Sequence, residues 1–242
     1  MVSALVAVVL AAGKGTRMGS DLPKVLHVLH GEPLVAHPIR AARAAGAGTV
    51  VVVVGHGADQ VQAALGAGDD LRYALQSEQR GTGHAVLCAL PAIAGHEGDV
   101  LILSGDVPRL RAGTLQRLAE ACRASPGGLA FATFTPIDPT GYGRVVRDGQ
   151  GQVLAIVEER DASPEQRLIL ECNAGVYCAS AALLRSELPQ LGSSNAQGEI
   201  YLTDLVAVAA GQGVTALTVP AEEVAGVNTR EQLAALAALP PV

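Results

Sequence analysis

The chain has 242 residues, of which 49% are hydrophobic and 17% charged, a balance that can bury a sizeable core and excludes an intrinsically disordered chain. Its formal net charge is −6, and its aromatic residues are four Tyr, two Phe and no Trp. This composition excludes the basic, aromatic-rich surface with which proteins bind nucleic-acid strands, so we expect no nucleic-acid polymer as a partner.

The N-terminal segment holds nine uninterrupted apolar residues, Ala4–Ala12, and no Lys or Arg precedes them. They therefore do not predict a signal peptide, and they are too few to span a bilayer as a helix, so we expect no membrane partner. A continuous Val/Leu run that ends at Gly13 is typical of a buried parallel strand. The four Cys residues form no C-x-x-C pair, which favours a reducing, cytoplasmic location.

Apolar runs with the length of strands recur along the chain, and helical patterns lie between most of them. We predict strands at Leu5–Leu10, Thr49–Val54, Val100–Leu103, Leu129–Phe134, Gly175–Cys178 and Val214–Val219. We predict helices at Leu34–Ala45, Ala58–Leu65, Thr82–Leu90, Ala112–Ala124, Ala181–Leu188 and Leu202–Ala209. Pro38 should kink or delay the first of these helices.

The alternation of strands and helices predicts an α/β fold, with a Rossmann-like, mainly parallel sheet flanked by helices. Ligands of such sheets bind beyond the carboxyl ends of the strands. Residues 141–159 break the alternation and predict a small antiparallel excursion of two short strands around the turn Asp148–Gly151. Because no repeat and no low-complexity linker divides the chain, we expect residues 1–242 to form a single domain.

The first predicted strand runs into the glycine-rich segment 11–19, AAGKGTRMG. Glycine lets backbone N–H groups approach phosphate oxygens, and Lys14 and Arg17 add positive charge, so the segment predicts a phosphorylated ligand. It is not a P-loop, and Met18 occupies the last glycine position of the dinucleotide fingerprint. If this motif is considered alone, one alternative stays open, namely a strand-to-helix turn that is rich in glycine for steric reasons only.

Residues 10–18, followed by Leu22-Pro23-Lys24, resemble the G-x-G-T-R-M…P-K signature of sugar nucleotidyltransferases. The segments that follow resemble the uridyltransferase half of the bifunctional N-acetylglucosamine-1-phosphate uridyltransferase/glucosamine-1-phosphate acetyltransferase family. They are residues 76–85 (QSEQRGTGHA), 105–108 (GDVP), 141–144 (GYGR), 156–159 (IVEE), 195–204 (NAQGEIYLTD) and 226–228 (GVN). Matched in order, these segments cover almost the whole chain.

The resemblance implies uridylyl transfer from UTP to N-acetylglucosamine 1-phosphate, which gives UDP-N-acetylglucosamine, a precursor for peptidoglycan and lipopolysaccharide, and pyrophosphate. A sugar-phosphate oxygen attacks the α-phosphorus, so catalysis should rest on in-line positioning and on neutralisation of charge by Mg²⁺, Arg and Lys. No nucleophilic side chain is required. In agreement, the sequence contains no G-x-S-x-G elbow and no recognisable Cys/His pairing.

The resemblance also implies roles for individual residues. Arg17 would bind the triphosphate and Lys24 the two reacting phosphates, and we expect both to be catalytic. Asp106, which follows a predicted strand, and Asn228 would be the metal ligands, because Mg²⁺ prefers oxygen donors. The other expected substrate-binding residues are Leu10, Ala11, Ala12 and Gly13 in the glycine-rich loop, Gln76, Gly81 and Thr82 around uracil, Ser104 and Gly105 beside Asp106, and Gly143, Glu158 and Asn173 around the sugar.

Several residues that could carry chemistry are expected to be structural. His27 and His30 lack a third metal ligand, and His84 is expected at a helix start rather than as an acid or base. The pair Glu158-Glu159 does not indicate a glycosidase, because neighbours in a strand point to opposite faces and cannot flank one bond. We therefore expect only Glu158 to face the pocket.

The chain departs from the family pattern in places. Ala174 stands where the family usually has Thr, so we expect sugar affinity or strictness to differ. Cys172 and Cys178, which flank Asn173, are expected to be small buried hydrophobes. In the family a left-handed β-helix with the acetyltransferase and the trimer contacts follows. Because this chain ends at Val242, we expect it to lack acetyltransferase activity and to be a monomer.

Two other interpretations stay open. One is a nucleotidyltransferase for another sugar 1-phosphate; molybdopterin and methylerythritol acceptors are disfavoured, because residues 10–13 (LAAG) and 23–25 (PKV) differ from those enzymes' usual motifs. The other is a catalytically silent sensor of a nucleotide sugar. The intact set of Arg17, Lys24, Asp106 and Asn228 favours an enzyme over a sensor.

Overall fold

All six predicted apolar strands belong to a nine-stranded sheet in the computed structural model, which describes residues 5–242. Ala4, the first residue of the predicted N-terminal run, lies outside the described residues. Strand β1 (Leu5–Leu10) pairs in parallel with β4 (Ala47–Val54) on one side and with β6 (Asp99–Ser104) on the other. Beyond β4 the sheet ends at β5 (Leu71–Leu75), which was not predicted.

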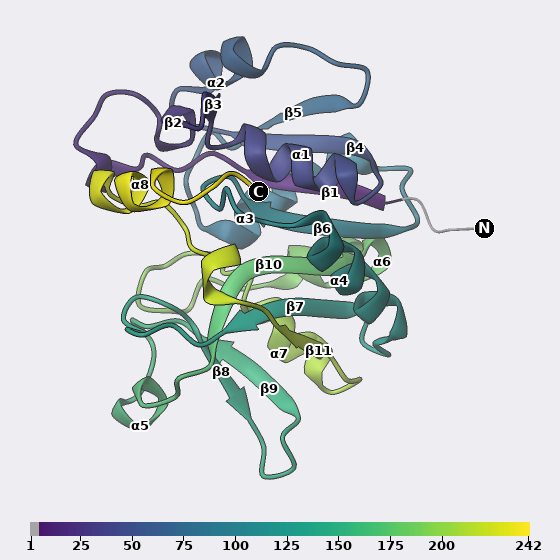
Figure 1. Ribbon diagram of the computed structural model, residues 1–242. Helices are drawn as coiled ribbons and strands as arrows, with labels where there is room; N and C mark the ends of the chain where they lie inside the picture. The colour runs from purple at the N-terminus through teal and green to yellow at the C-terminus, as the bar shows by residue number, and fades with distance from the viewer. Residues whose placement is uncertain (1–4) are drawn as a thin grey trace.

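The other half of the sheet contains one reversal that the sequence analysis did not predict. Strand β10 (Cys172–Ser180) runs antiparallel to both β6 and β7 (Leu129–Phe134), whereas β11 (Thr215–Thr218) is parallel to β7. The segment between β7 and β10 contains no crossover helix along the sheet, so the chain re-enters from the end at which β7 finished. The α/β class and the mainly parallel sheet are nevertheless confirmed (Figure 1).

The predicted antiparallel excursion is confirmed as the hairpin of β8 (Arg144–Arg147) and β9 (Val153–Val157), which projects from the lower end of the molecule in Figure 1. Its turn is held by Asp148, whose Oδ1 accepts hydrogen bonds from the backbone N of Gln150 and of Gln152. The hairpin joins the main sheet where Arg144 pairs with Cys172 at the start of β10. This junction places the hairpin at the same edge of the sheet as the carboxyl ends of the parallel strands.

Helices cover both faces of the sheet and enclose two hydrophobic clusters. One face is covered by α1 (Ala36–Ala44), α2 (Ala58–Leu65) and α4 (Ala112–Ala124), and the other by α3 (Thr82–Ala89), α6 (Ala181–Glu187) and α7 (Asp204–Ala210). Helix α1 begins two residues later than predicted and contains Pro38 in its first turn, where a missing N–H breaks no helical hydrogen bond. Two further helices were not predicted: the short α5 (Pro164–Arg167) and α8 (Arg230–Ala237).

A third, smaller cluster joins the two ends of the chain. It buries Met18, Leu29, Leu34, Val227 and Leu236. Figure 1 shows the result: the yellow helix α8 lies beside the purple segment that follows β1 and the small hairpin of β2 (Val28–Leu29) and β3 (Glu32–Pro33). None of the helices within residues 5–242 has the length and apolar character that crossing a membrane requires.

Candidate active site

A pocket of about 280 Å³ opens at the carboxyl ends of β1 and β6, the edge at which ligands of parallel sheets bind. Ten of the predicted site residues line it: Leu10, Ala11, Ala12, Gly13, Lys24, Gln76, Gly81, Thr82, Ser104 and Asp106. Gly105 belongs to the same edge, because its backbone N donates to the Leu10 carbonyl over 2.9 Å. The pocket therefore brings together residues from the glycine-rich loop, the 76–82 segment and the end of β6.

The glycine-rich loop is shaped by one turn and anchored by one buried side chain. Gly15 has φ +60°, and a Cβ there would overlap the side chain of Lys24, so only glycine fits. Residues Thr16–Met18 form a single 3-10 turn in which Met18 is buried and Arg17 is exposed. From α8, Arg230 donates to the carbonyls of Met18 (3.0 Å) and Gly19 (3.1 Å). The loop is thus fixed at its base, while Arg17 stays on its exposed side.

Lys24 lies at the centre of a charged cluster at the pocket wall. Its Nζ donates to Asp106 Oδ2 and, over 3.0 Å, to Asn228 Oδ1. Arg17 Nη2 donates to the same Asn228 Oδ1 over 2.8 Å. The four residues predicted to be catalytic or metal-binding therefore meet, although Lys24 and Asn228 are 204 residues apart in the chain.

Asn228 is held by the start of α8. The N-cap Thr229 accepts a hydrogen bond from Gln232 N, and Gln232 Oε1 accepts from the backbone N of Asn228 over 2.7 Å. The backbone N of Val227 donates to the Asp106 carbonyl over 2.9 Å, which joins this segment directly to the end of β6. The cap therefore fixes the position of the carboxamide.

The oxygens of Asp106 and Asn228 suit a hard divalent cation, because both already converge on one positive charge, the Lys24 ammonium. Within residues 5–242 no group of three His, Cys, Asp or Glu side chains could hold a metal. A cation bound here would take its remaining oxygen ligands from water and from phosphate, as Mg²⁺ commonly does.

Gln76 lines the larger pocket and is only 4% exposed. Its Nε2 donates to the Gly81 carbonyl (3.0 Å) and lies 3.1 Å from His84 Nδ1. The Gly81–Thr82 turn is fixed from outside by residues 199–202: Ile200 O accepts from Gly83 N over 2.8 Å, and Thr82 Oγ1 accepts from Leu202 N over 3.0 Å. These bonds bring two of the sequence motifs, residues 76–85 and 195–204, together.

A second, smaller pocket of about 80 Å³ shares Leu10, Thr82 and Ser104 with the first and is also lined by Glu158 and Asn173. Asn173 Nδ2 donates to the hydroxyl of Tyr177 over 2.6 Å, and Asn173 Oδ1 accepts from Gly175 N over 3.0 Å. The backbone N of Asn173 donates to the carbonyl of Gly143 over 2.9 Å. The predicted sugar residues Gly143, Glu158 and Asn173 therefore lie together, next to the larger pocket.

Glu158 and Glu159 have separate environments. Glu158 lines the small pocket and accepts a hydrogen bond from Thr203 Oγ1 over 3.0 Å; burial raises its pKa above the usual value, against the smaller lowering effect of that bond. Glu159 instead pairs with the buried Arg144 at 2.7 Å. The expectation that only Glu158 faces the pocket is confirmed, but both residues lie just beyond β9 rather than inside a strand.

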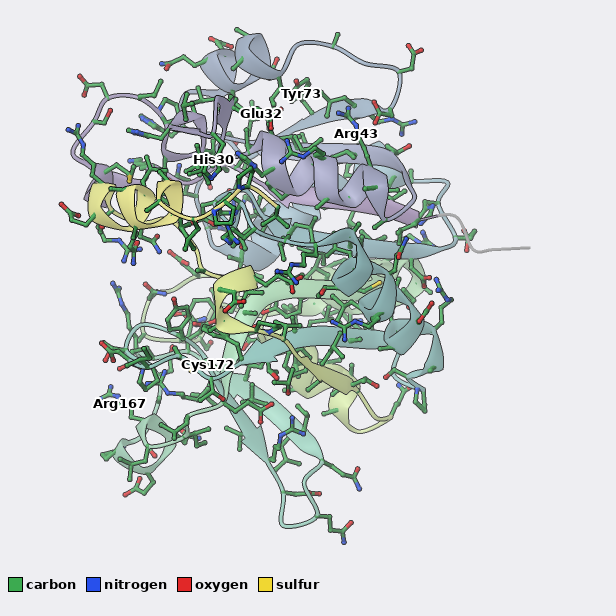
Figure 2. The ribbon with its side chains drawn as sticks, in the orientation of Figure 1. His30, Glu32, Arg43, Tyr73, Arg167 and Cys172 are labelled. Atoms are coloured by element: carbon green, nitrogen blue, oxygen red, sulfur yellow. The ribbon has the colours of Figure 1, made fainter. Side chains whose placement is uncertain are left out.

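The two histidines that are expected to be structural lie beside the small hairpin of β2 and β3. His27 and His30 belong to no metal-binding group within residues 5–242, and His30 has φ +53° in the β2–β3 turn. Cys172, labelled in Figure 2 where β10 meets the hairpin, is buried and free, as is Cys178. Ala174 packs in a hydrophobic cluster of the sheet and lines neither pocket, so the expected loss of a hydroxyl beside the sugar site has no structural basis.

Some pocket residues were missed by the sequence analysis. Gln79 donates to the Ala12 carbonyl over 2.7 Å and so closes one side of the larger pocket; Glu199 also lines that pocket. Both belong to segments that the motif comparison quoted, so a signal existed. Tyr177 and Thr203 line the smaller pocket. Tyr177 gave no signal, because a Tyr inside an apolar strand is indistinguishable from a core residue.

Comparison with known proteins agrees with this geometry. The family model described as the MobA-like NTP transferase domain matches residues 7–193. Three similar curated proteins are each called "Bifunctional protein GlmU". The one from Trichlorobacter lovleyi is 53% identical over 94% of this chain and 50% of its own length. Those from Anaeromyxobacter sp. strain Fw109-5 and Chromohalobacter salexigens are 55% and 52% identical, each over 95% of this chain and over 48% and 50% of their own lengths.

The chain spans about half the length of the curated relatives it matches. The family match includes the glycine-rich loop, the Asp106 strand end and most residues of both pockets, and the identity of about one residue in two extends over nearly the whole chain. The resemblance stated from the sequence motifs is thereby confirmed. The chain belongs to the family of MobA-like NTP transferase domains.

Proposed function

We propose that the chain transfers the uridylyl group of UTP to N-acetylglucosamine 1-phosphate, producing UDP-N-acetylglucosamine and pyrophosphate. The observation that carries this proposal is the Lys24–Asp106–Asn228 cluster, of which Lys24 and Asp106 line a pocket that shares residues with a second one. A cationic centre beside two linked pockets suits a reaction in which two phosphorylated molecules must meet.

The larger pocket would hold the nucleotide. Gln76 presents a side-chain amide in an enclosed position, and an amide can pair with the imide edge of uracil. Leu10, Ala11, Ala12 and Gly13 border the same pocket, so the loop backbone would lie along the ribose and the phosphates. The triphosphate would then lie next to Lys24, which lines the pocket, and next to Arg17, which shares the Asn228 oxygen with Lys24.

The charged cluster would neutralise the phosphates. Asp106 and Asn228 would hold Mg²⁺, whose bound charge lowers the repulsion between the two substrates and stabilises negative charge on the phosphoryl oxygens. Arg17 and Lys24 would bind the triphosphate and the reacting phosphates. In the free protein Lys24 Nζ contacts both proposed metal ligands, so the ammonium occupies the place of a cation until the substrates arrive.

The smaller pocket would bind the acceptor. Glu158 accepts hydrogen bonds from sugar hydroxyls, and Asn173 and the backbone of Gly143 offer an amide and a peptide group for the acetamido substituent. A phosphate oxygen of the acceptor forms a bond to the α-phosphorus of UTP. The bond between the α-phosphorus and the bridging oxygen breaks, and pyrophosphate leaves with that oxygen. The side chains position the substrates and stabilise charge, and none forms a covalent intermediate.

The test is pyrophosphate release with Mg²⁺, using UTP, CTP, dTTP and GTP against N-acetylglucosamine 1-phosphate and glucose 1-phosphate. Release confined to UTP with N-acetylglucosamine 1-phosphate supports both pocket assignments. Release with another pair moves the function to a different nucleotidyltransferase. A folded protein that binds UDP-N-acetylglucosamine but gives no release with any pair indicates the sensor.

Two variants sharpen this test. Asp106→Ala removes a proposed metal ligand and should abolish release. Asp70→Asn, the matched control, removes an exposed acid that pairs only with Arg43 on the surface and should leave release unchanged. The single-domain organisation, the cytoplasmic location, the monomeric state and the lack of acetyltransferase activity stay predictions.

A further inference from the structure

The amide of Gln76 has only one polar atom left for a ligand. Both hydrogens of its Nε2 have an acceptor, the Gly81 carbonyl at 3.0 Å and His84 Nδ1 at 3.1 Å. Its Oε1 accepts no hydrogen bond from any residue in 5–242, and it is not sealed from solvent. Because Gln76 lines the larger pocket, this oxygen faces the space in which a base would lie.

The Gly81 carbonyl fixes the orientation of the amide. If the amide turned over, Oε1 would face the Gly81 carbonyl oxygen, and two acceptors repel each other, so Nε2 is the atom on this side. The His84 ring must therefore accept at Nδ1 and carry its proton at Nε2. Its Nε2 lies 3.9 Å from Cys88 Sγ, one turn further along α3, and can donate to that sulfur.

We propose that His84 is a positioning residue that makes this pocket select uracil over cytosine, by holding the Gln76 oxygen toward the base. The proposal rests on the proposed function, in which the larger pocket binds the nucleotide. Uracil carries a hydrogen at N3 and donates it to an acceptor, whereas cytosine has a lone pair at N3 and is repelled by one. The contacts from Cys88 to His84 and from His84 to Gln76 thus determine which base the pocket prefers.

Two substitutions at His84 separate this role from a purely structural one. His84→Phe keeps a ring of similar size and removes the acceptor. His84→Asn is the matched rescue, because Asn Oδ1 occupies the same position along the side chain as His Nδ1 and can accept from Gln76. The measured quantity is the ratio of kcat/KM for UTP to kcat/KM for CTP, with N-acetylglucosamine 1-phosphate as acceptor.

The expected result is a UTP:CTP ratio about five- to tenfold lower in His84→Phe, the equivalent of one lost hydrogen bond, and within about twofold of the unsubstituted protein in His84→Asn. A structural role would lower kcat/KM for both nucleotides together and leave the ratio unchanged. An unchanged ratio in His84→Phe, or an equal fall in both variants, overturns the proposal.

A second pair of variants covers the case in which His84→Phe does not fold. Cys88→Ala removes the acceptor for His84 Nε2 and should lower the ratio about threefold, whereas Cys88→Ser keeps an acceptor and should preserve it. Equal ratios in these two variants contradict the proposal. The unsubstituted protein is measured first: if it does not prefer UTP, the proposed function itself fails, and that outcome is distinct from a preference that His84 does not influence.

Discussion

Gly81 is a position at which a single methyl group should disturb both the fold and the nucleotide pocket. Its φ of +100° and ψ of 176° belong to a region that only glycine adopts readily. A Cβ at this position would lie 2.5 Å from the Ile200 carbonyl oxygen and 2.9 Å from Glu199 Cβ. Gly81→Ala must therefore change the backbone of the turn, displace residues 199–200, or both.

The magnitude follows from those two effects. The unfavourable backbone conformation costs about 1–3 kcal/mol. Displacement of Ile200 breaks its hydrogen bond from Gly83 N, which costs a further ~1 kcal/mol. We expect Gly81→Ala to lower the free energy of unfolding by about 3 kcal/mol. Because the Gly81 carbonyl also holds the Gln76 amide, the KM for UTP should rise in the protein that remains folded.

Urea unfolding followed by circular dichroism measures the first effect, and initial rates at varied UTP measure the second. The matched control is Gly113→Ala, because Gly113 lies in α4 and a Cβ there would have no neighbour within 4 Å. That variant should be more stable by ~0.5 kcal/mol, since Ala favours a helix over Gly. A free energy of unfolding of Gly81→Ala within about 0.5 kcal/mol of the unsubstituted protein would refute the reasoning.

Three further predictions concern the charged cluster and the sugar pocket. Thr229→Ala removes the N-cap of α8 and should lower the free energy of unfolding by ~1 kcal/mol, whereas Thr229→Ser should not; urea unfolding distinguishes them. Burial raises the pKa of Glu158, so its charged form destabilises the folded state, and Glu158→Gln should have a higher free energy of unfolding at pH 7.5. Below pH 4.5, the ordinary pKa of a Glu side chain, the carboxyl is protonated in both states and this gain should vanish; urea unfolding across pH measures it. Lys24→Met removes the ammonium from Asp106 and Asn228, so Mn²⁺ titrated calorimetrically into the free protein should bind several-fold more tightly; weaker binding would contradict the proposed metal site.

The parallel centre of the sheet could be predicted because its strands carry their own signal. Residues 50–54 of β4 are completely buried, so every position is apolar and the run stands out from its surroundings. Strand β5 lies at the edge of the sheet, and Leu75 at its end is 62% exposed. A short edge strand with polar residues has no such continuous pattern, and it was missed for that reason.

The direction of β10 could not be predicted, because the period of a strand contains no information on its direction. Its antiparallel course has a consequence for the site. The start of β10, rather than its end, lies at the ligand-binding edge, which is why Asn173 near its N-terminal end reaches the small pocket. Asn173 was nevertheless identified, since the motif comparison depends on residue identity and not on strand direction.

The contact between the glycine-rich loop and Asn228 could not be predicted from the sequence motifs alone. Each motif was visible in the sequence, but their contact depends on the third cluster, in which Met18 from the loop packs with Val227 and with Leu236 of α8. Arg230 of α8 adds hydrogen bonds to the carbonyl of Met18. The helix that holds one proposed metal ligand is therefore the same element that anchors the phosphate loop. Loosening α8 should weaken metal binding and phosphate binding together, whereas a change confined to the hairpin should affect only the sugar pocket.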